Sequence, residues 1–117
     1  MRGMSSTIPN HVLKFAAERD WGQFHSPKNL ASALSVEASE LLEHFQWIDS
    51  EASYDLPEDK KKEVAYEIAD VVNYALRLSD VLQIDLDTVV KEKIELNAKK
   101  YPVDQVRGSA KKYSEYE

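Results

Sequence analysis

The sequence predicts an all-α fold, an antiparallel four-helix bundle that ends in a polar C-terminal tail. Two observations lead to this prediction. Apolar residues recur at three- and four-residue steps in four segments, which is the spacing of amphipathic helices, whereas the alternation typical of strands is almost absent. The three glycines and four prolines lie at or near the ends of these segments, so they interrupt none of the helices.

Local start and stop signals set the bounds of the helices. Ser26 can cap the second helix, with Pro27 in its first turn, and Pro57 opens the third after a polar connection. Asp85 is a suitable cap for the fourth helix, which should end before Pro102. The expected helices cover about residues 8–19, 27–48, 57–82 and 86–101.

The apolar positions of the long third helix divide into two sets. The main stripe, which we expect to form the core, contains Val64, Ile68, Val71, Ala75, Leu78 and Leu82. Val72 and Leu76 are offset from it. Because a small bundle buries little area alone, we expect this second set to pack against another subunit of a homo-oligomer.

Length and composition limit the class of protein. A chain of 117 residues is expected to form one domain, here residues 1–117 with a helical core over about residues 8–101 and a tail over 102–117. A formal net charge of −6 argues against a nucleic-acid-binding surface, which needs a basic stripe. The chain lacks cysteine, and no apolar stretch approaches membrane-spanning length. A cytoplasmic protein is expected.

Two acidic pairs stand beside apolar stripes. Glu37 and Glu40 are three residues apart in the second helix, and Glu67 and Asp70 repeat this spacing in the third. Residues three apart share a helix face, so packing of the two helices would bring four carboxylates together at the margin of the core. Such groups repel unless some are protonated or a cation lies among them. The alternative is that both pairs form ordinary solvated helix faces.

The ligand types decide which metal such a cluster would hold. An all-oxygen site suits Mg²⁺, or Mn²⁺ in its place, better than zinc. His44, one turn after Glu40, is either a fifth ligand or a partly buried polar residue. A carboxylate-bridged di-iron site would need two Glu-x-x-His motifs, and neither acidic pair supplies one.

The acidic pairs belong to a longer pattern. The stretches are "EASE" and, after 26 intervening residues, "EIAD", together with "FAAERDWGQFHSPKNLASAL", "ELLEHFQW", "EKIELNAKKYP" and "RGSAKKYSEY". This combination resembles the all-α nucleoside triphosphate pyrophosphohydrolases of the MazG-like superfamily, and within it the dCTP pyrophosphatase branch. The resemblance extends over about residues 12–116.

The resemblance implies Mg²⁺-dependent cleavage between the α- and β-phosphates, with release of a nucleoside monophosphate and pyrophosphate, in nucleotide-pool control or disposal of altered bases. It implies that Trp21 and Trp47 enclose the base, with His25 in the same loop as Trp21, and that Tyr74 contacts sugar or base. It further implies four metal ligands and three phosphate-side residues, respectively Glu37, Glu40, Glu67 and Asp70, and Lys93, Asn97 and Tyr101.

One position departs from the branch. Its members can have a histidine nine residues before the tryptophan that matches Trp21, where this chain has Val12. The departure concerns the preference for cytosine and not the reaction. The resemblance also implies a homodimer or homotetramer with sites near subunit boundaries.

Two of these interpretations can also be weighed without the resemblance. Lys93, Asn97 and Tyr101 form one ridge at four-residue spacing, which suits phosphate binding or simply a solvated face. Trp21 and Trp47 both lie near helix ends, where they could stack on a base or anchor a core or an interface.

Glu40 is the expected general base, because it lies further from the apolar stripe than Glu37. Two other functions remain open. One is a non-enzymatic helical adaptor whose acidic edge meets a basic partner protein. The other is a related enzyme that cleaves dUTP or a non-nucleotide pyrophosphate.

Overall fold

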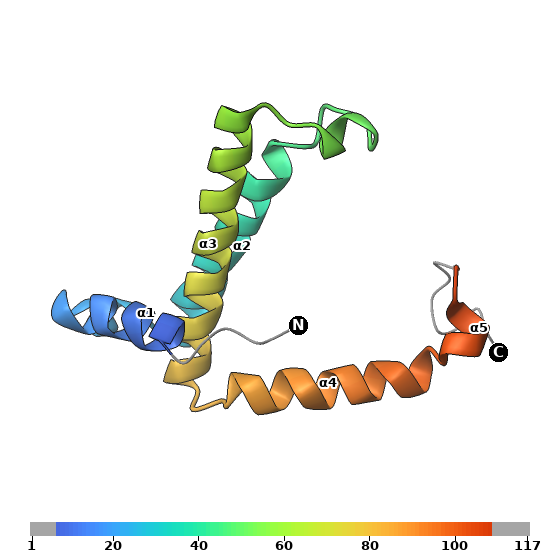
Figure 1. Ribbon diagram of the computed structural model, residues 1–117. Coiled ribbons are helices and arrows are strands. Elements are labelled where there is room, and N and C mark those ends of the chain that lie inside the picture. Colours follow the sequence, from blue (N-terminus) through green and yellow to red (C-terminus); the bar gives the residue numbers. More distant parts are fainter. Residues whose placement is uncertain (1–6, 109–117) are drawn as a thin grey trace. The chain divides into compact units, whose positions relative to one another are not determined.

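Every regular element in the described part of the chain, residues 7–108 of a computed structural model, is helical (Figure 1). The predicted all-α class and the four predicted helices are therefore confirmed. The predicted tail contains one short helix, and its residues 109–117 lie outside the described part. The elements are α1 (Thr7–Glu18), a 3₁₀ turn (Trp21–Phe24), α2 (Pro27–Glu43), a second 3₁₀ turn (Ala52–Tyr54), α3 (Glu58–Val81), α4 (Leu86–Lys100) and α5 (Val103–Val106).

The chain divides into two compact units, Met1–Ile84 and Asp85–Glu117. In the first unit, α2 and α3 run antiparallel and side by side, joined by the polar connection, and α1 crosses the C-terminal part of α3 (Figure 1). The second unit holds α4 and α5. The expectation that the whole chain forms one domain stays a prediction.

Helix α2 begins as predicted and ends early. The Ser26 hydroxyl accepts a hydrogen bond from the Asn29 backbone amide at 3.1 Å, and Pro27 occupies the first turn. The helix stops at Glu43, short of the predicted residue 48. The amide of His44 donates to the Leu41 carbonyl, an i→i−3 bond, so the chain tightens into turns beyond the helix.

The two ends of α3 are stabilised in different ways. Pro57 occupies the cap position and its side chain makes no capping hydrogen bond, while Glu58 and Asp59 place negative charge at the positive end of the helix dipole. At the other end Gln83 has a φ of 59°, and the Ile84 amide donates to the Ser79 carbonyl at 2.8 Å. This is a Schellman ending with glutamine where glycine is usual.

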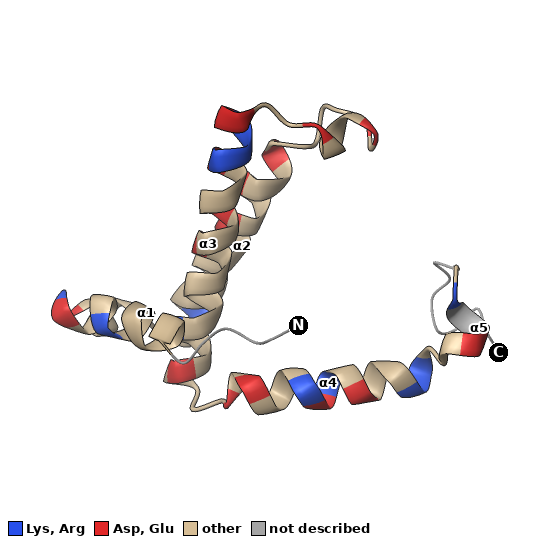
Figure 2. Cartoon of the chain, viewed as in Figure 1, with Lys and Arg blue, Asp and Glu red and all other residues tan. Residues whose placement is uncertain are grey.

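The second unit is organised around α4. The Asp85 carboxylate accepts a hydrogen bond from the Thr88 amide at 3.3 Å, so the predicted cap is present. Acidic and basic residues alternate along this helix (Figure 2), and Lys91 and Asp87 form an ion pair at 3.0 Å. Such exposed i,i+4 pairs add little to the stability of the helix.

The buried core of the first unit is small. Leu30 is 1% exposed, and Val64 and Leu76 are also buried. Leu76 was predicted to face another subunit, and that prediction is wrong because the residue packs inside its own chain. Ile68 and Leu82, which were predicted for the core, are each 49% exposed. The predicted stripe is therefore buried only in part, and Ile68 is left available to a further partner.

No helix in the described ranges is long and apolar enough to cross a membrane. The cytoplasmic location stays a prediction.

Candidate functional site

The two acidic pairs converge where α2 packs against α3. One carboxylate oxygen from each of Glu37, Glu67 and Asp70 lies within 4.8 Å of the other two. Acidic turns in the middle of α3 lie beside α2 in Figure 2. The three-residue spacing keeps Glu67 and Asp70 on one face of α3, and the antiparallel packing turns that face towards Glu37. Three of the four predicted ligands are therefore brought together, and their role in metal binding stays a prediction.

Two oxygens of this cluster are in an unfavourable position. One carboxylate oxygen of Glu37 and one of Glu67 are shielded from solvent, and neither has a hydrogen-bond partner among the described residues. A buried acceptor without a donor is destabilising, and a buried negative charge more so. The arrangement therefore calls for a proton or a cation, and an all-oxygen donor set fits a hard divalent ion.

The pKa of Glu37 reflects the same combination of burial and neighbouring negative charge. The pKa of Glu37 is raised from 4.5 to about 7, first by burial and then by hydrogen bonds with the Glu67 and Glu40 carboxylates, which can share its proton. The negative charges of Glu40 and Asp70 act in the same direction. Carboxylates that raise one another's pKa are common in metal sites, because the groups that gather around a cation repel one another when no cation lies between them.

Glu40 and His44 have different surroundings. Glu40 is partly buried and close enough to Glu37 to raise its pKa, but it does not belong to the three-residue cluster. His44 faces elsewhere: the Lys60 ammonium donates to its Nδ1 at 3.3 Å, and Glu63 lies 3.9 Å from the same nitrogen. Of the two interpretations of His44, these contacts favour the partly buried polar residue.

A hollow of about 250 Å³ opens directly beside the acidic cluster. Asp70 belongs to both the cluster and the hollow. The other walls come from α1, from the first 3₁₀ turn and from the next two turns of α3, namely Phe15, Trp21, Asn73, Tyr74 and Arg77. The predicted base-side residues Trp21 and Tyr74 are thus on the wall of one cavity with a predicted metal ligand.

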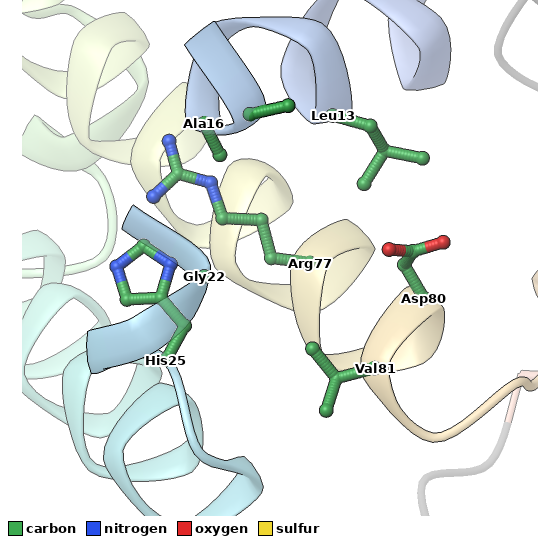
Figure 3. A pocket seen from close by; sticks show the side chains of 8 residues that line it. Leu13, Ala16, Gly22, His25, Arg77, Asp80 and Val81 are labelled. Atoms are coloured by element: carbon green, nitrogen blue, oxygen red, sulfur yellow. The ribbon is translucent and has the colours of Figure 1, made fainter. Parts of the chain in front are cut away.

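The aromatic side chains around this hollow support one another. The Phe15 and Trp21 rings meet edge to face at 5.4 Å, and the Trp21 and His25 rings at 6.1 Å. The Arg77 guanidinium lies 5.4 Å from the Trp21 ring centroid and also borders His25 (Figure 3). Burial lowers the pKa of His25, and the positive charge of Arg77 lowers it further. His25 is therefore a neutral group at neutral pH, able to donate and accept hydrogen bonds.

Trp47 does not take its predicted place opposite Trp21 within this chain. Trp21 precedes the N-terminus of α2 and Trp47 follows its C-terminus, and 17 helical residues separate them. A helix of that length spans roughly 25 Å at 1.5 Å per residue. Trp47 is 86% exposed. The two indoles of a single chain cannot enclose one base.

The predicted phosphate-side residues lie in the second unit. Lys93 and Asn97 are exposed on α4, and Tyr101 caps its C-terminus with its amide donating to the Asn97 carbonyl at 2.9 Å. Their four-residue spacing on one helix is confirmed. Their relation to the acidic cluster stays a prediction.

Comparison with known proteins agrees with this geometry. Residues 32–116, which include both acidic pairs, match the MazG-like family. This chain belongs to the MazG-like family. A pyrophosphatase from Archaeoglobus fulgidus, solved by crystallography, is 40% identical with a TM-score of 0.76, and the match covers 87% of this chain and 98% of that one. The helical arrangement expected of a MazG-like protein is therefore confirmed.

Curated relatives in the MazG-like family include mammalian proteins. Mouse dCTP pyrophosphatase 1 is 42% identical over 104 residues, and human dCTP pyrophosphatase 1 is 39% identical over 107 residues. Each match covers 87% of this chain but 61% of the relative's length. The predicted resemblance to the dCTP pyrophosphatases is confirmed at the level of sequence, over about three fifths of those proteins.

Sequence reasoning missed three residues of the hollow. Phe15, Asn73 and Arg77 were not among the predicted site residues, yet all three line it. A signal existed for two of them, because Asn73 and Arg77 follow Asp70 by three and seven residues and therefore share its helix face. Phe15 comes from α1, and no pattern in the sequence indicates where α1 crosses α3.

Proposed function

We propose that this protein is a Mg²⁺-dependent nucleoside triphosphate pyrophosphohydrolase that cleaves the α–β phosphoanhydride, with dCTP or a modified dCTP as substrate. One observation carries the proposal: the converging carboxylates adjoin a hollow lined by Trp21 and Tyr74, with Asp70 common to both. The relatives are themselves named as a pyrophosphatase and as dCTP pyrophosphatase 1. Its cellular role would be control of the nucleotide pool or disposal of altered bases.

Glu37, Glu67 and Asp70 would hold the metal, with Glu40 beside them as the fourth ligand. The two shielded oxygens of Glu37 and Glu67 support this, because a cation would supply the partner that each lacks. Mg²⁺, or Mn²⁺ in its place, would neutralise charge on the phosphate oxygens and on the departing pyrophosphate. Glu37 would be fully ionised in this state, since a neighbouring cation favours the carboxylate.

Glu40 is the residue that we propose as general base. It lies outside the tight three-carboxylate group, so one of its oxygens is the best candidate to accept a proton from the attacking water. The water's oxygen replaces the bridging oxygen on phosphorus, the phosphoanhydride bond breaks, and pyrophosphate leaves. Glu40 then releases the proton to solvent.

The base would stack in the hollow on Trp21, with Tyr74 at the sugar or base and His25 behind Trp21. Stacking of a base on an aromatic ring contributes roughly 1–3 kcal/mol. Lys93, Asn97 and Tyr101 would contact phosphate oxygens, because an ammonium and an amide on one ridge can donate to oxygens that the metal only partly neutralises.

We further propose a homodimer or homotetramer in which Trp47 contributes to the site of another subunit. The support is its position: Trp47 is 86% exposed and lies at the end of α2 opposite to Trp21. Large apolar side chains elsewhere on the first unit are also exposed, including Ile68 and Leu42. Exposed large apolar side chains that gather in one patch mark a subunit interface, and the proposal expects these residues to do so.

The test is a panel of all common ribo- and deoxynucleoside triphosphates, assayed with Mg²⁺ for released pyrophosphate. The proposal expects a monophosphate and pyrophosphate in equal amounts, dependence on the metal, and the highest kcat/KM for dCTP. A preference for dUTP would favour the related-enzyme alternative. Release of inorganic phosphate instead of pyrophosphate would refute the proposed reaction. If the protein hydrolysed none of the nucleotides, the proposal would be refuted and an adaptor favoured.

A further inference from the structure

Arg77 is a buried cation that forms no ion pair with the described residues. The residue is 9% exposed, and its Nε is shielded from solvent with no hydrogen-bond partner in the described chain. The nearest acid on its helix, Asp80, lies across a separate hollow from the guanidinium (Figure 3), and no ion pair forms between them. A buried guanidinium that is met by aromatic rings, with a donor left unused, favours a ligand that accepts hydrogen bonds from it.

The position of Arg77 indicates which part of a ligand it meets. Its guanidinium lies 5.4 Å from the Trp21 ring and 5.5 Å from the Tyr74 ring, and it lines the hollow that Asp70 also lines. Arg77 follows Asp70 by seven residues on the same face of α3, which places it roughly 10 Å further along the helix. If the acids hold the phosphates, Arg77 is at the far, aromatic end of the hollow.

We propose that Arg77 selects the base by donating two hydrogen bonds to the O2 and N3 acceptors of cytosine. The inference rests on the proposed function and adds its specificity determinant. A guanidinium can only donate, and its planar fork matches two adjacent acceptors. Cytosine offers such a pair, whereas N3 of uracil and thymine carries a hydrogen that would face a donor. Arg77 therefore favours cytosine and disfavours uracil.

Arg77→Met and Arg77→Lys test the proposal. Methionine removes the charge at similar volume, and lysine keeps the charge without the fork. We expect the wild-type protein to prefer dCTP over dUTP in kcat/KM, and both variants to lose that preference by roughly 5- to 150-fold, the range of a good bidentate base contact. Arg19→Met is the matched control, because Arg19 stacks on Phe15 at 3.6 Å without lining the hollow. It should leave the ratio unchanged.

Several outcomes would overturn the proposal. An equal loss on dCTP and dUTP would show that Arg77 contacts phosphate or only supports the fold. An unchanged ratio in Arg77→Lys would do the same, and this variant decides if Arg77→Met fails to fold. A wild-type protein that releases pyrophosphate from both nucleotides equally well would refute the base contact and the preference for dCTP, but not the pyrophosphohydrolase reaction. If it released none from any nucleotide, the reaction would be refuted as well.

Discussion

Glu37 on α2 and Glu67 on α3 each turn one solvent-shielded carboxylate oxygen into the same cluster, and neither oxygen has a hydrogen-bond donor within the described residues. Two helices brought together by apolar contacts thus place like charges where they repel. The free energy of that repulsion is a measurable quantity, and it changes with metal and with pH. The effects of metal and of pH on the free energy of unfolding should both reflect this repulsion.

Divalent metal should stabilise the fold. With Mg²⁺ or Mn²⁺ at about 100 times its Kd, we expect the melting temperature to rise by about 10 °C, because a ligand at that excess adds about 2.7 kcal/mol to the free energy of unfolding. Glu67→Gln should abolish most of the shift. Glu43→Gln, an exposed carboxylate on α2, is the matched control and should keep it. Equal shifts in both variants would mean that metal binds elsewhere.

The metal-free protein should lose stability as pH rises from about 4.5 to about 7. In this range native Glu37, with its pKa raised to about 7, holds a proton that the unfolded chain releases at its ordinary pKa of 4.5. The native state therefore binds more protons, and raising the pH lowers the free energy of unfolding. Glu37→Gln removes this contribution. Thermal melts in the presence of a chelator should show the melting temperature of Glu37→Gln rising relative to that of the wild type as the pH is raised to 8. A difference in melting temperature that is independent of pH would contradict the assignment.

The acidic cluster was predictable because it depends on local spacing. Three-residue steps in two neighbouring helices place Glu37, Glu67 and Asp70 on facing sides once α2 and α3 are antiparallel. The connection between the two helices favours this antiparallel arrangement. Which apolar positions of α3 face the core could not be predicted from the sequence, because Ile68 and Leu76 are both apolar and either could face inwards. Side-chain type alone does not distinguish a core position from an interface position.

Glu40→Gln should abolish turnover while leaving binding intact. A general base contributes about 10²–10⁴-fold, so we expect kcat to fall by about 100-fold or more. KM for dCTP and the metal-induced rise in melting temperature should change little, because Glu37, Glu67 and Asp70 remain. Steady-state kinetics combined with calorimetric nucleotide titration would measure both. Activity close to wild type would show that another group takes the proton.

Trp21 and Trp47 should complement each other between subunits. Trp21→Ala should raise KM by roughly 5- to 150-fold through loss of stacking. Trp47→Ala should raise KM by a similar factor and Asp70→Asn should be nearly inactive, whereas a mixture allowed to exchange subunits should regain activity at low dCTP concentration. A mixed oligomer then combines the intact acids of one chain with the intact Trp47 of the other. No recovery despite exchange, or particles of only 13.4 kDa in sedimentation, would contradict shared sites.

The placement of Trp47 shows where sequence reasoning stopped. Both indoles lie near helix ends, and the sequence does not say that these are opposite ends of α2. Nor does it show Arg77 between the Trp21 and Tyr74 rings, because that contact depends on how α1 and the first 3₁₀ turn pack against α3. Long-range packing, not local pattern, determines these neighbours.

Leu30 should be the most sensitive apolar position of the first unit. It is 1% exposed, so Leu30→Ala leaves a cavity beneath α2 and should lower the free energy of unfolding by about 2–5 kcal/mol. Leu42→Ala is the matched control, since Leu42 is 61% exposed in the single chain and should change the value by less than about 0.5 kcal/mol. Urea unfolding measures both. A loss at Leu30 below about 1 kcal/mol would contradict the described packing, whereas a loss at Leu42 that grows with protein concentration would place that residue in a subunit interface.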